Sequence, residues 1–320
     1  MRIASSRVLV RTATSATTVL LAGGLLFAGT GAATALDLGS LASGSLGSSG
    51  SLGSLDAGSS TPLAATPHLE SIANFRDVGG NDGNGYATGL GRHLKRGVVY
   101  RANALTSASE ADLQTLTGLG ITSITDMRGV AEIANPLVGG QDKIPTGADY
   151  VNTPIEFADL VQLAQTIQSP EQGRQFMEDT NRSFVTDPVR RAGFAKVLTD
   201  IANSDGPVIF HCTSGKDRTG WVSALLQQIG GASAETVMSD YLLSNDYLEP
   251  VNTRTLAQIR HALGDQAALN LTPVLGVEAS FLQSGLTQMR ADYGNLLGYL
   301  TDGLGLDNTT IVKLATKMWA

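Results

Sequence analysis

A single cysteine lies in a segment whose residue types suit covalent chemistry on a bound phosphate. The segment reads His211-Cys212-Thr213-Ser214-Gly215-Lys216-Asp217-Arg218-Thr219-Gly220, in a chain of 320 residues. An apolar run, 207–210, precedes it, and a helix-like stretch, 221–229, follows it. A strand, a tight loop and a helix N-terminus form an anion pocket, because free backbone N–H groups and the helix dipole converge there. The segment therefore predicts a thiol aimed at a bound phosphate.

Each side chain of this loop has an expected role. Cys212 attacks as a thiolate, which nearby N–H donors and cations favour. Arg218 offers a planar fork that can grip two phosphate oxygens. Thr219 can donate a hydrogen bond to the sulfur and so help it leave, while His211 orients the loop. Backbone N–H groups are expected from Thr213, Ser214, Gly215 and Lys216.

The leaving oxygen needs a proton, which a positioned carboxylic acid can deliver. Asp217 lies within the loop, next to the phosphate-gripping arginine. Asp126 follows another predicted strand and is the alternative. The sequence favours Asp217, and the choice between the two depends on geometry.

The chain divides into three parts by composition. Residues 1–35 combine a basic start, an apolar stretch and the small-x-small pattern Ala33-Thr34-Ala35, which predicts a cleaved secretory signal peptide and no stable membrane insertion after cleavage. Residues 36–67 are rich in Gly and Ser and predict a flexible linker, with attachment to cell-wall material as an alternative role. Residues 68–320 are expected to form one domain. The chain is therefore predicted to be secreted.

Charge and ligand-forming residues exclude several functions. The net charge is −7, and it becomes more negative without the arginines of the leader, which argues against nucleic-acid binding. One cysteine forms no disulfide within the chain, so in an exported protein it predicts a reactive thiol. The four histidines show no ligand spacing, so no metal and no cofactor are expected. The oligomeric state is not predicted.

The domain reads as an α/β fold with a mostly parallel central sheet flanked by helices and an all-helical C-terminal part. Strands are expected at 97–101, 121–126, 150–153 and 207–211. Helices are expected after a capping box at 107–110 and after Asp187-Pro188, within 156–181, and throughout the chain after 231, with breaks near Pro250, Pro273 and Gly303. Asp126 and Cys212 both end strands, so they are expected to share one edge of the sheet.

The loop resembles that of the cysteine-dependent protein-tyrosine phosphatase superfamily, in particular a bacterial branch with the motif HCxxGKDRTG. Further similar segments are Asn74-Phe75-Arg76-Asp77-Val78-Gly79-Gly80, Tyr100-Arg101-Ala102 and Asp126-Met127-Arg128. The resemblance implies the phosphatase fold and activity on phosphotyrosine, with phosphoserine, phosphothreonine and phosphoinositides as further substrates. It also implies that Lys216 contacts an extra lipid phosphate, that Asp217 is the acid, and that a helical lid covers about 239–264.

Two other functions compete with a phosphatase. A rhodanese-like sulfurtransferase also uses a cysteine in an anion-binding loop, but it has no need for a loop aspartate as proton donor. A non-catalytic phosphate-binding module is the second alternative, although it would be expected to lose Cys212 or Arg218. Arg76 and Asp77 are expected either to face the cleft or to fix a turn by an ion pair.

Overall fold

The computed structural model describes residues 63–320, apart from 90, 136–138 and 159. The predicted signal peptide and most of the predicted linker lie outside these residues. The last part of that linker contacts the domain, because Arg96 donates hydrogen bonds to the carbonyls of Leu63 and Ala64 at 3.1 and 2.9 Å.

Five strands form the central sheet in the order β1-β2-β5-β3-β4. Their bounds are β1 Arg76–Asp77, β2 Val99–Ala102, β3 Ser123–Asp126, β4 Asp149–Asn152 and β5 Val208–His211. All neighbours pair in parallel except β1, which runs antiparallel to β2. This confirms the mostly parallel sheet. The register places Asp126 directly opposite His211, so the ends of β3 and β5 do meet at one edge.

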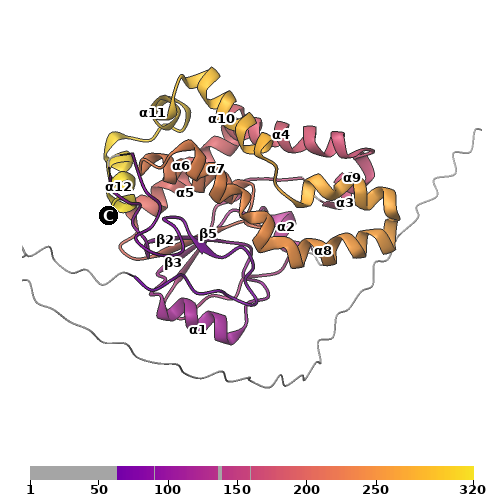
Figure 1. Cartoon of the computed structure of the whole chain (residues 1–320), viewed down its shortest axis with the longest axis horizontal. Coiled ribbons are helices and arrows are strands. Elements are labelled where there is room, and N and C mark those ends of the chain that lie inside the picture. The colour runs from indigo at the N-terminus through magenta and orange to yellow at the C-terminus, as the bar shows by residue number, and fades with distance from the viewer. Residues whose placement is uncertain (1–62, 90, 136–138, 159) are drawn as a thin grey trace, which may run out of the picture. The chain divides into compact units, whose positions relative to one another are not determined.

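Helices cover both faces of the sheet, with α1 on one side and α5 and α6 on the other (Figure 1). The first group is α1 Glu110–Gly118, α2 Val130–Ala134, α3 Leu160–Thr166, α4 Pro170–Thr186 and α5 Pro188–Asn203. The helices after the last strand are α6 Arg218–Ile229, α7 Ala234–Leu242, α8 Ser244–Leu263, α9 Asp265–Leu275, α10 Ala279–Tyr293, α11 Leu296–Gly298, the π-helical turn Tyr299–Gly303 and α12 Asn308–Met318. The helical C-terminal part is therefore confirmed.

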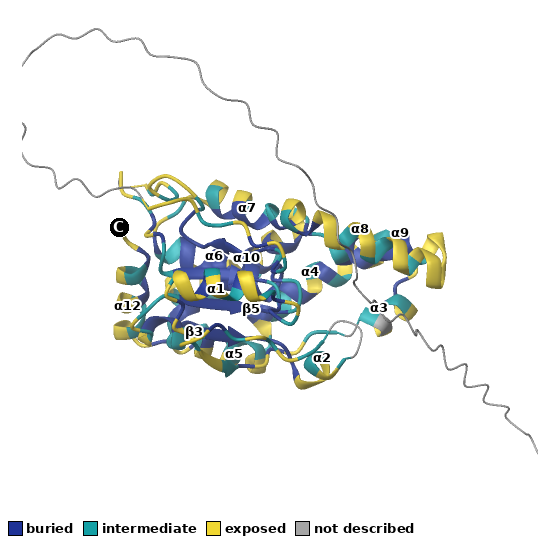
Figure 2. Ribbon diagram, turned by 90° about the horizontal axis from the view of Figure 1, so that it is seen from below, coloured by how far each residue is buried: buried dark blue, intermediate teal, exposed yellow. Residues whose placement is uncertain are grey.

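Alternating side chains of the strands fill two apolar cores. Ile209 packs on the α1 side with Ile124 and Leu116. Val208 and Phe210 pack on the other side, in the larger core that includes α5 and α6. Figure 2 shows that α6 and β5 are buried. Because both faces are covered, β5, which leads into the loop, is packed on either side.

Two local predictions were wrong. The cap of α1 is Ser109, which accepts a hydrogen bond from Asp112 N at 3.1 Å, and not Ser107. Pro250 and Pro273 lie inside α8 and α9 and do not end them. Each proline removes one helical hydrogen bond, and packing of α9 against α8 and α4 offsets this loss. The break at Gly303, where the π-helical turn ends, and the start of α5 after its cap Asp187 are confirmed.

The predicted lid corresponds to the end of α7 and to α8. α7 is anchored by buried residues, among them Asp240 and Tyr241, whereas α8 has no buried residue beyond Leu248. Its movement stays a prediction. Within the described part of the chain, no helix is both long and apolar enough to cross a membrane.

Candidate active site

The loop after β5 places a thiol next to the first turn of α6. Cys212 is buried, and its Sγ accepts a hydrogen bond from Thr219 Oγ1 at 3.2 Å. α6 begins at Arg218, so its free N–H groups and positive dipole end lie beside the sulfur. The predicted contact between Thr219 and the sulfur is therefore present.

Gly215 allows the loop to turn tightly against β2. Its φ is +68°, and a Cβ at this position would lie 2.1 Å from the carbonyl oxygen of Ala102. Any side chain would therefore collide with the strand, in a backbone conformation that favours glycine.

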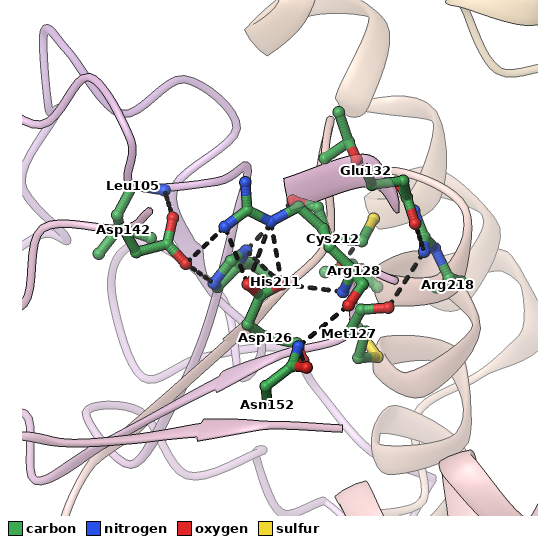
Figure 3. Close-up of polar contacts among 12 residues, drawn as sticks. Leu105, Asp126, Met127, Arg128, Glu132, Asp142, Asn152, His211, Cys212 and Arg218 are labelled. Atoms are coloured by element: carbon green, nitrogen blue, oxygen red, sulfur yellow. Dashed lines mark hydrogen bonds and ion pairs between the residues drawn. The ribbon is translucent and has the colours of Figure 1, made fainter. Parts of the chain in front are cut away.

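Arg218 is held on one edge and free on the other. Nη1 donates to the carbonyls of Met127 and Ile155 at 3.0 and 2.7 Å. Glu132 accepts from both terminal nitrogens, at 2.7 Å from Nη1 and 2.6 Å from Nη2 (Figure 3). Nε is buried and has no hydrogen-bond partner in the described residues. A buried donor without a partner is costly, so Nε is available for an anion in the loop.

Glu132 is a site residue that the sequence analysis missed. It lies in the first turn of α2, where it also accepts from Gly129 N at 2.9 Å and from Thr213 Oγ1 at 2.6 Å. Burial alone would raise the pKa of Glu132, but the hydrogen bonds and charge of Arg218 outweigh it and hold the pKa below its usual value. The carboxylate is therefore an anion that fixes Arg218. The only signal in the sequence was a Gly-x-x-Glu capping pattern, which indicates a helix start and not a site.

Lys216 and Asp217 form an ion pair within the loop. The ammonium lies 3.0 and 2.8 Å from the two carboxylate oxygens, and both side chains are largely buried. Asp217 immediately precedes Arg218, the first residue of α6. Its role as the acid stays a prediction.

Asp126 has a different environment, in a cluster with Arg128, Asp142 and His211 (Figure 3). It is fully buried, and Arg128 donates to both of its oxygens while Tyr150 Oη donates to one of them, at 2.8 Å. Asp126 is therefore held in a buried cluster of its own. Which of the two candidate aspartates is the acid stays a prediction.

His211 is part of the same buried cluster. Its Nε2 lies 3.0 Å from Asp142 Oδ2, and its Nδ1 lies 3.2 Å from the carbonyl oxygen of Cys212. Burial alone would lower the pKa of His211, but the adjacent Asp142 and Asp126 carboxylates outweigh it and raise the pKa. The imidazole of His211 thus contacts the backbone of the loop at Cys212, which agrees with an orienting role. Asp142, which the sequence analysis also missed, fixes its ring.

Ligating atoms of Asp126, Asp142 and His211 lie within 4.8 Å of one another. The guanidinium of Arg128 donates to both carboxylates, at 2.8 Å to Asp126 and 2.9 Å to Asp142. This arginine already supplies the positive charge that a metal ion would bring. The prediction of no metal stays a prediction.

Comparison with known proteins identifies the family. Residues 67–320 match the model of the tyrosine phosphatase family. The chain belongs to this family. The family's reaction is phosphoester hydrolysis, which decides against the sulfurtransferase alternative.

Two relatives cover most of the chain. A Cupriavidus necator protein named as a tyrosine-protein phosphatase is 32% identical over 240 residues, covering 75% of this chain and 84% of its own length. The triple specificity protein phosphatase PtpB of Mycobacterium tuberculosis is 28% identical over 285 residues, covering 78% and 98%. Among solved structures, P. aeruginosa TpbA in complex with phosphotyrosine has a TM-score of 0.28 at 13% identity, covering 61% of this chain and 89% of its own.

Proposed function

We propose that this member of the family is an exported phosphomonoester hydrolase that acts on phosphotyrosine through a phosphocysteine intermediate. The observation that carries the proposal is that Cys212 and Arg218 lie at the two ends of one loop. The sulfur has a hydrogen-bond donor in Thr219, and the guanidinium has an unpartnered Nε. A nucleophile and a hydrogen-bond donor for an anion therefore lie in one loop, at a helix N-terminus whose dipole also favours a phosphate.

In the first step, the Cys212 thiolate attacks phosphorus and forms an S–P bond while the P–O bond to the substrate breaks. The departing oxygen takes a proton from Asp217. For this, Asp217 must be neutral, whereas it is paired with Lys216 in the free enzyme. A bound phosphate dianion competes for the same ammonium. Substrate entry therefore draws Lys216 away, and Asp217 takes up a proton from solvent before the step.

In the second step, water attacks phosphorus and the S–P bond breaks. Asp217 takes the proton of this water, and Cys212 leaves as a thiolate. The hydrogen bond from Thr219 Oγ1 stabilises the sulfur anion as it forms. Inorganic phosphate is the product. As it leaves, Asp217 gives its proton to solvent and pairs with Lys216 again.

The substrate range is proposed to include phosphoserine, phosphothreonine and phosphoinositides. PtpB, whose name states triple specificity, is 28% identical to this chain over a match that covers almost its whole length. Lys216 supplies a second cation beside Arg218, which suits a substrate with more than one phosphate. Export is proposed from residues 1–35 alone, and an N-terminus at residue 36 in protein recovered from the medium would test it.

The function is tested with the protein from residue 36 onward and with its Cys212→Ser variant. Four substrates are compared: an aryl phosphate, a phosphotyrosine peptide, a phosphoserine peptide and a monophosphorylated phosphoinositide. Turnover of the first two that is lost in the variant is expected. The ratio among the four ranks protein substrates against lipid.

Failure would have a clear form. Absence of turnover on all four, with the protein folded and its thiol reduced, would contradict the proposal. Binding of phosphate without turnover would then indicate the non-catalytic module. Turnover that persists in Cys212→Ser would exclude the phosphocysteine intermediate.

A further inference from the structure

Two buried side chains from outside the loop donate hydrogen bonds to its backbone carbonyls. Asn74 Nδ2 lies 3.0 Å from Ser214 O and 2.9 Å from Gly215 O. Arg101 Nη2 lies 2.8 Å from Gly215 O. Asn74 precedes β1 and Arg101 belongs to β2, so both donors come from the sheet edge beside β5. These contacts lie in the two segments, 74–80 and 100–102, that the proposed mechanism leaves unexplained.

The direction of these carbonyls fixes the direction of two N–H groups. The described peptide bonds are all trans, and in a trans peptide the C=O and the N–H point opposite ways. The carbonyl of Ser214 shares its peptide with the N–H of Gly215, and the carbonyl of Gly215 shares its peptide with the N–H of Lys216. Since Asn74 and Arg101 hold both carbonyls outward, both N–H groups face the inner side of the loop.

We propose that Asn74 and Arg101 are positioning residues that hold the N–H groups of Gly215 and Lys216 toward the bound phosphate. The proposal rests on the proposed function, because it assumes that the loop binds a phosphoryl group. A donor on each carbonyl also polarises the peptide and makes its N–H a stronger donor. Oriented donors of this kind need no rearrangement when charge develops in the transition state.

The two positioning residues are themselves fixed by a buried ion-pair network. Arg76 donates to Asn74 Oδ1, which leaves Nδ2 to face the loop. Asp240 accepts from Arg76 Nε at 3.1 Å and from Arg101 Nη1 at 3.0 Å. Arg76 also donates to Ser244 Oγ at 3.1 Å, at the start of α8. The network thus links the loop to the junction of α7 and α8.

The backbone conformation of Asn74 agrees with a positioning role. Among the described residues it is the one non-glycine with positive φ, at +58°, and its side chain is fully buried. Asparagine tolerates this left-handed conformation better than most residues. A residue that only closed a turn could be glycine, whereas the two contacts to the loop require an amide at this position.

The test compares two variants with matched controls. Asn74→Asp removes the donor at nearly constant volume, and Arg101→Lys keeps the charge but cannot reach Asp240 and Gly215 together. Asn181→Asp and Arg96→Lys are the controls, because these side chains are also buried and donate to backbone carbonyls, at Met177 and Gly80. Binding of tungstate is measured by titration calorimetry, kcat and KM on an aryl phosphate are measured in parallel, and thermal unfolding is followed for all four.

Asn74→Asp and Arg101→Lys are both expected to bind tungstate about 10- to 100-fold more weakly than wild type. Their kcat should fall to a similar degree, as it does when oriented oxyanion donors are removed. The controls should lose stability only. Tungstate binding and kcat unchanged from wild type in a folded Asn74→Asp and Arg101→Lys would overturn the proposal. Failure of both to fold while both controls fold would also overturn it, because the role would then be structural. Tungstate calorimetry needs no turnover, so it still tests the role of Asn74 and Arg101 if the wild-type enzyme is inactive. Inactivity of the wild type would contradict the proposed function only.

Discussion

Glu132 accepts hydrogen bonds from both terminal nitrogens of Arg218, with Oε2 2.7 Å from Nη1 and Oε1 2.6 Å from Nη2. A guanidinium has two edges that can grip an anion. Glu132 occupies one of them and leaves the edge with Nε without a partner in the described residues. The carboxylate therefore determines which edge of Arg218 remains available to an anion.

Glu132→Gln should weaken phosphate binding and turnover together. The amide keeps the shape of the side chain but loses the charge, so the guanidinium is held less firmly. A fall in kcat/KM of about 10- to 100-fold is expected, in the range for a misplaced oxyanion donor. Glu178→Gln is the control, because Glu178 pairs with Arg182 at 3.1 Å on α4. Wild-type kcat/KM in Glu132→Gln would show that Arg218 needs no such support.

The loop could be predicted from the sequence because its chemistry is local. A strand, a glycine with positive φ and a helix N-terminus follow one another within 208–229, so this order of elements can be recognised without any distant segment. Glu132 is separated from Arg218 by 86 residues, and Asn74 from Gly215 by 141. Such contacts depend on how the elements pack, which a single sequence does not reveal.

The helix start at Ser109 shows the same limit on a smaller scale. Ser107 and Ser109 both suit a cap by residue type. Ser109 is chosen because Ser71 Oγ accepts from its N–H at 2.7 Å, while Asp112 accepts from Ser71 N at 2.7 Å. A distant segment therefore decides where this helix begins. In the same way, tertiary packing continues α8 and α9 through prolines that were expected to end them.

Gly215→Ala should abolish oxyanion binding, because the added Cβ would lie 2.1 Å from Ala102 O. Gly120→Ala is a matched control: its φ of +71° is almost the same, but nothing lies within 4 Å of the added Cβ. The control should cost about 1 kcal/mol of stability from backbone strain alone. Tungstate titration and thermal unfolding separate the two effects. Normal binding by a folded Gly215→Ala would mean that the loop can shift away from β2.

Asp217→Asn and Asp126→Asn should fail in different ways. Loss of the proton donor is expected to slow alkyl phosphates and phosphoserine by about 10²- to 10⁴-fold, and aryl phosphates with good leaving groups much less. Asp126→Asn removes one of the two carboxylate partners of the buried Arg128, so it should lower the unfolding temperature with no dependence on the leaving group. A plot of kcat/KM against the pKa of the leaving group tests both. The opposite pattern would assign the acid to Asp126.

His211 should make the stability of the protein fall as the pH rises above neutral. Asp142 and Asp126 raise its folded-state pKa above the unfolded value of about 6.5, although burial opposes this shift and Arg128 also faces the ring. The protonated ring therefore contributes stability that is fully present below pH 6.5 or so and is lost as the pH rises through the folded-state pKa.

Asp142→Asn tests this linkage. The variant should be less stable than wild type at about pH 6, and its stability should depend less on pH above that value, because the charged partner of His211 is gone. Asp149→Asn, at an exposed position, is the control. NMR titration of the His211 ring should show a lower pKa in Asp142→Asn than in wild type. An unchanged ring pKa would mean that Asp126 alone holds the proton on His211, and Asp142 would then serve only to pair with Arg128.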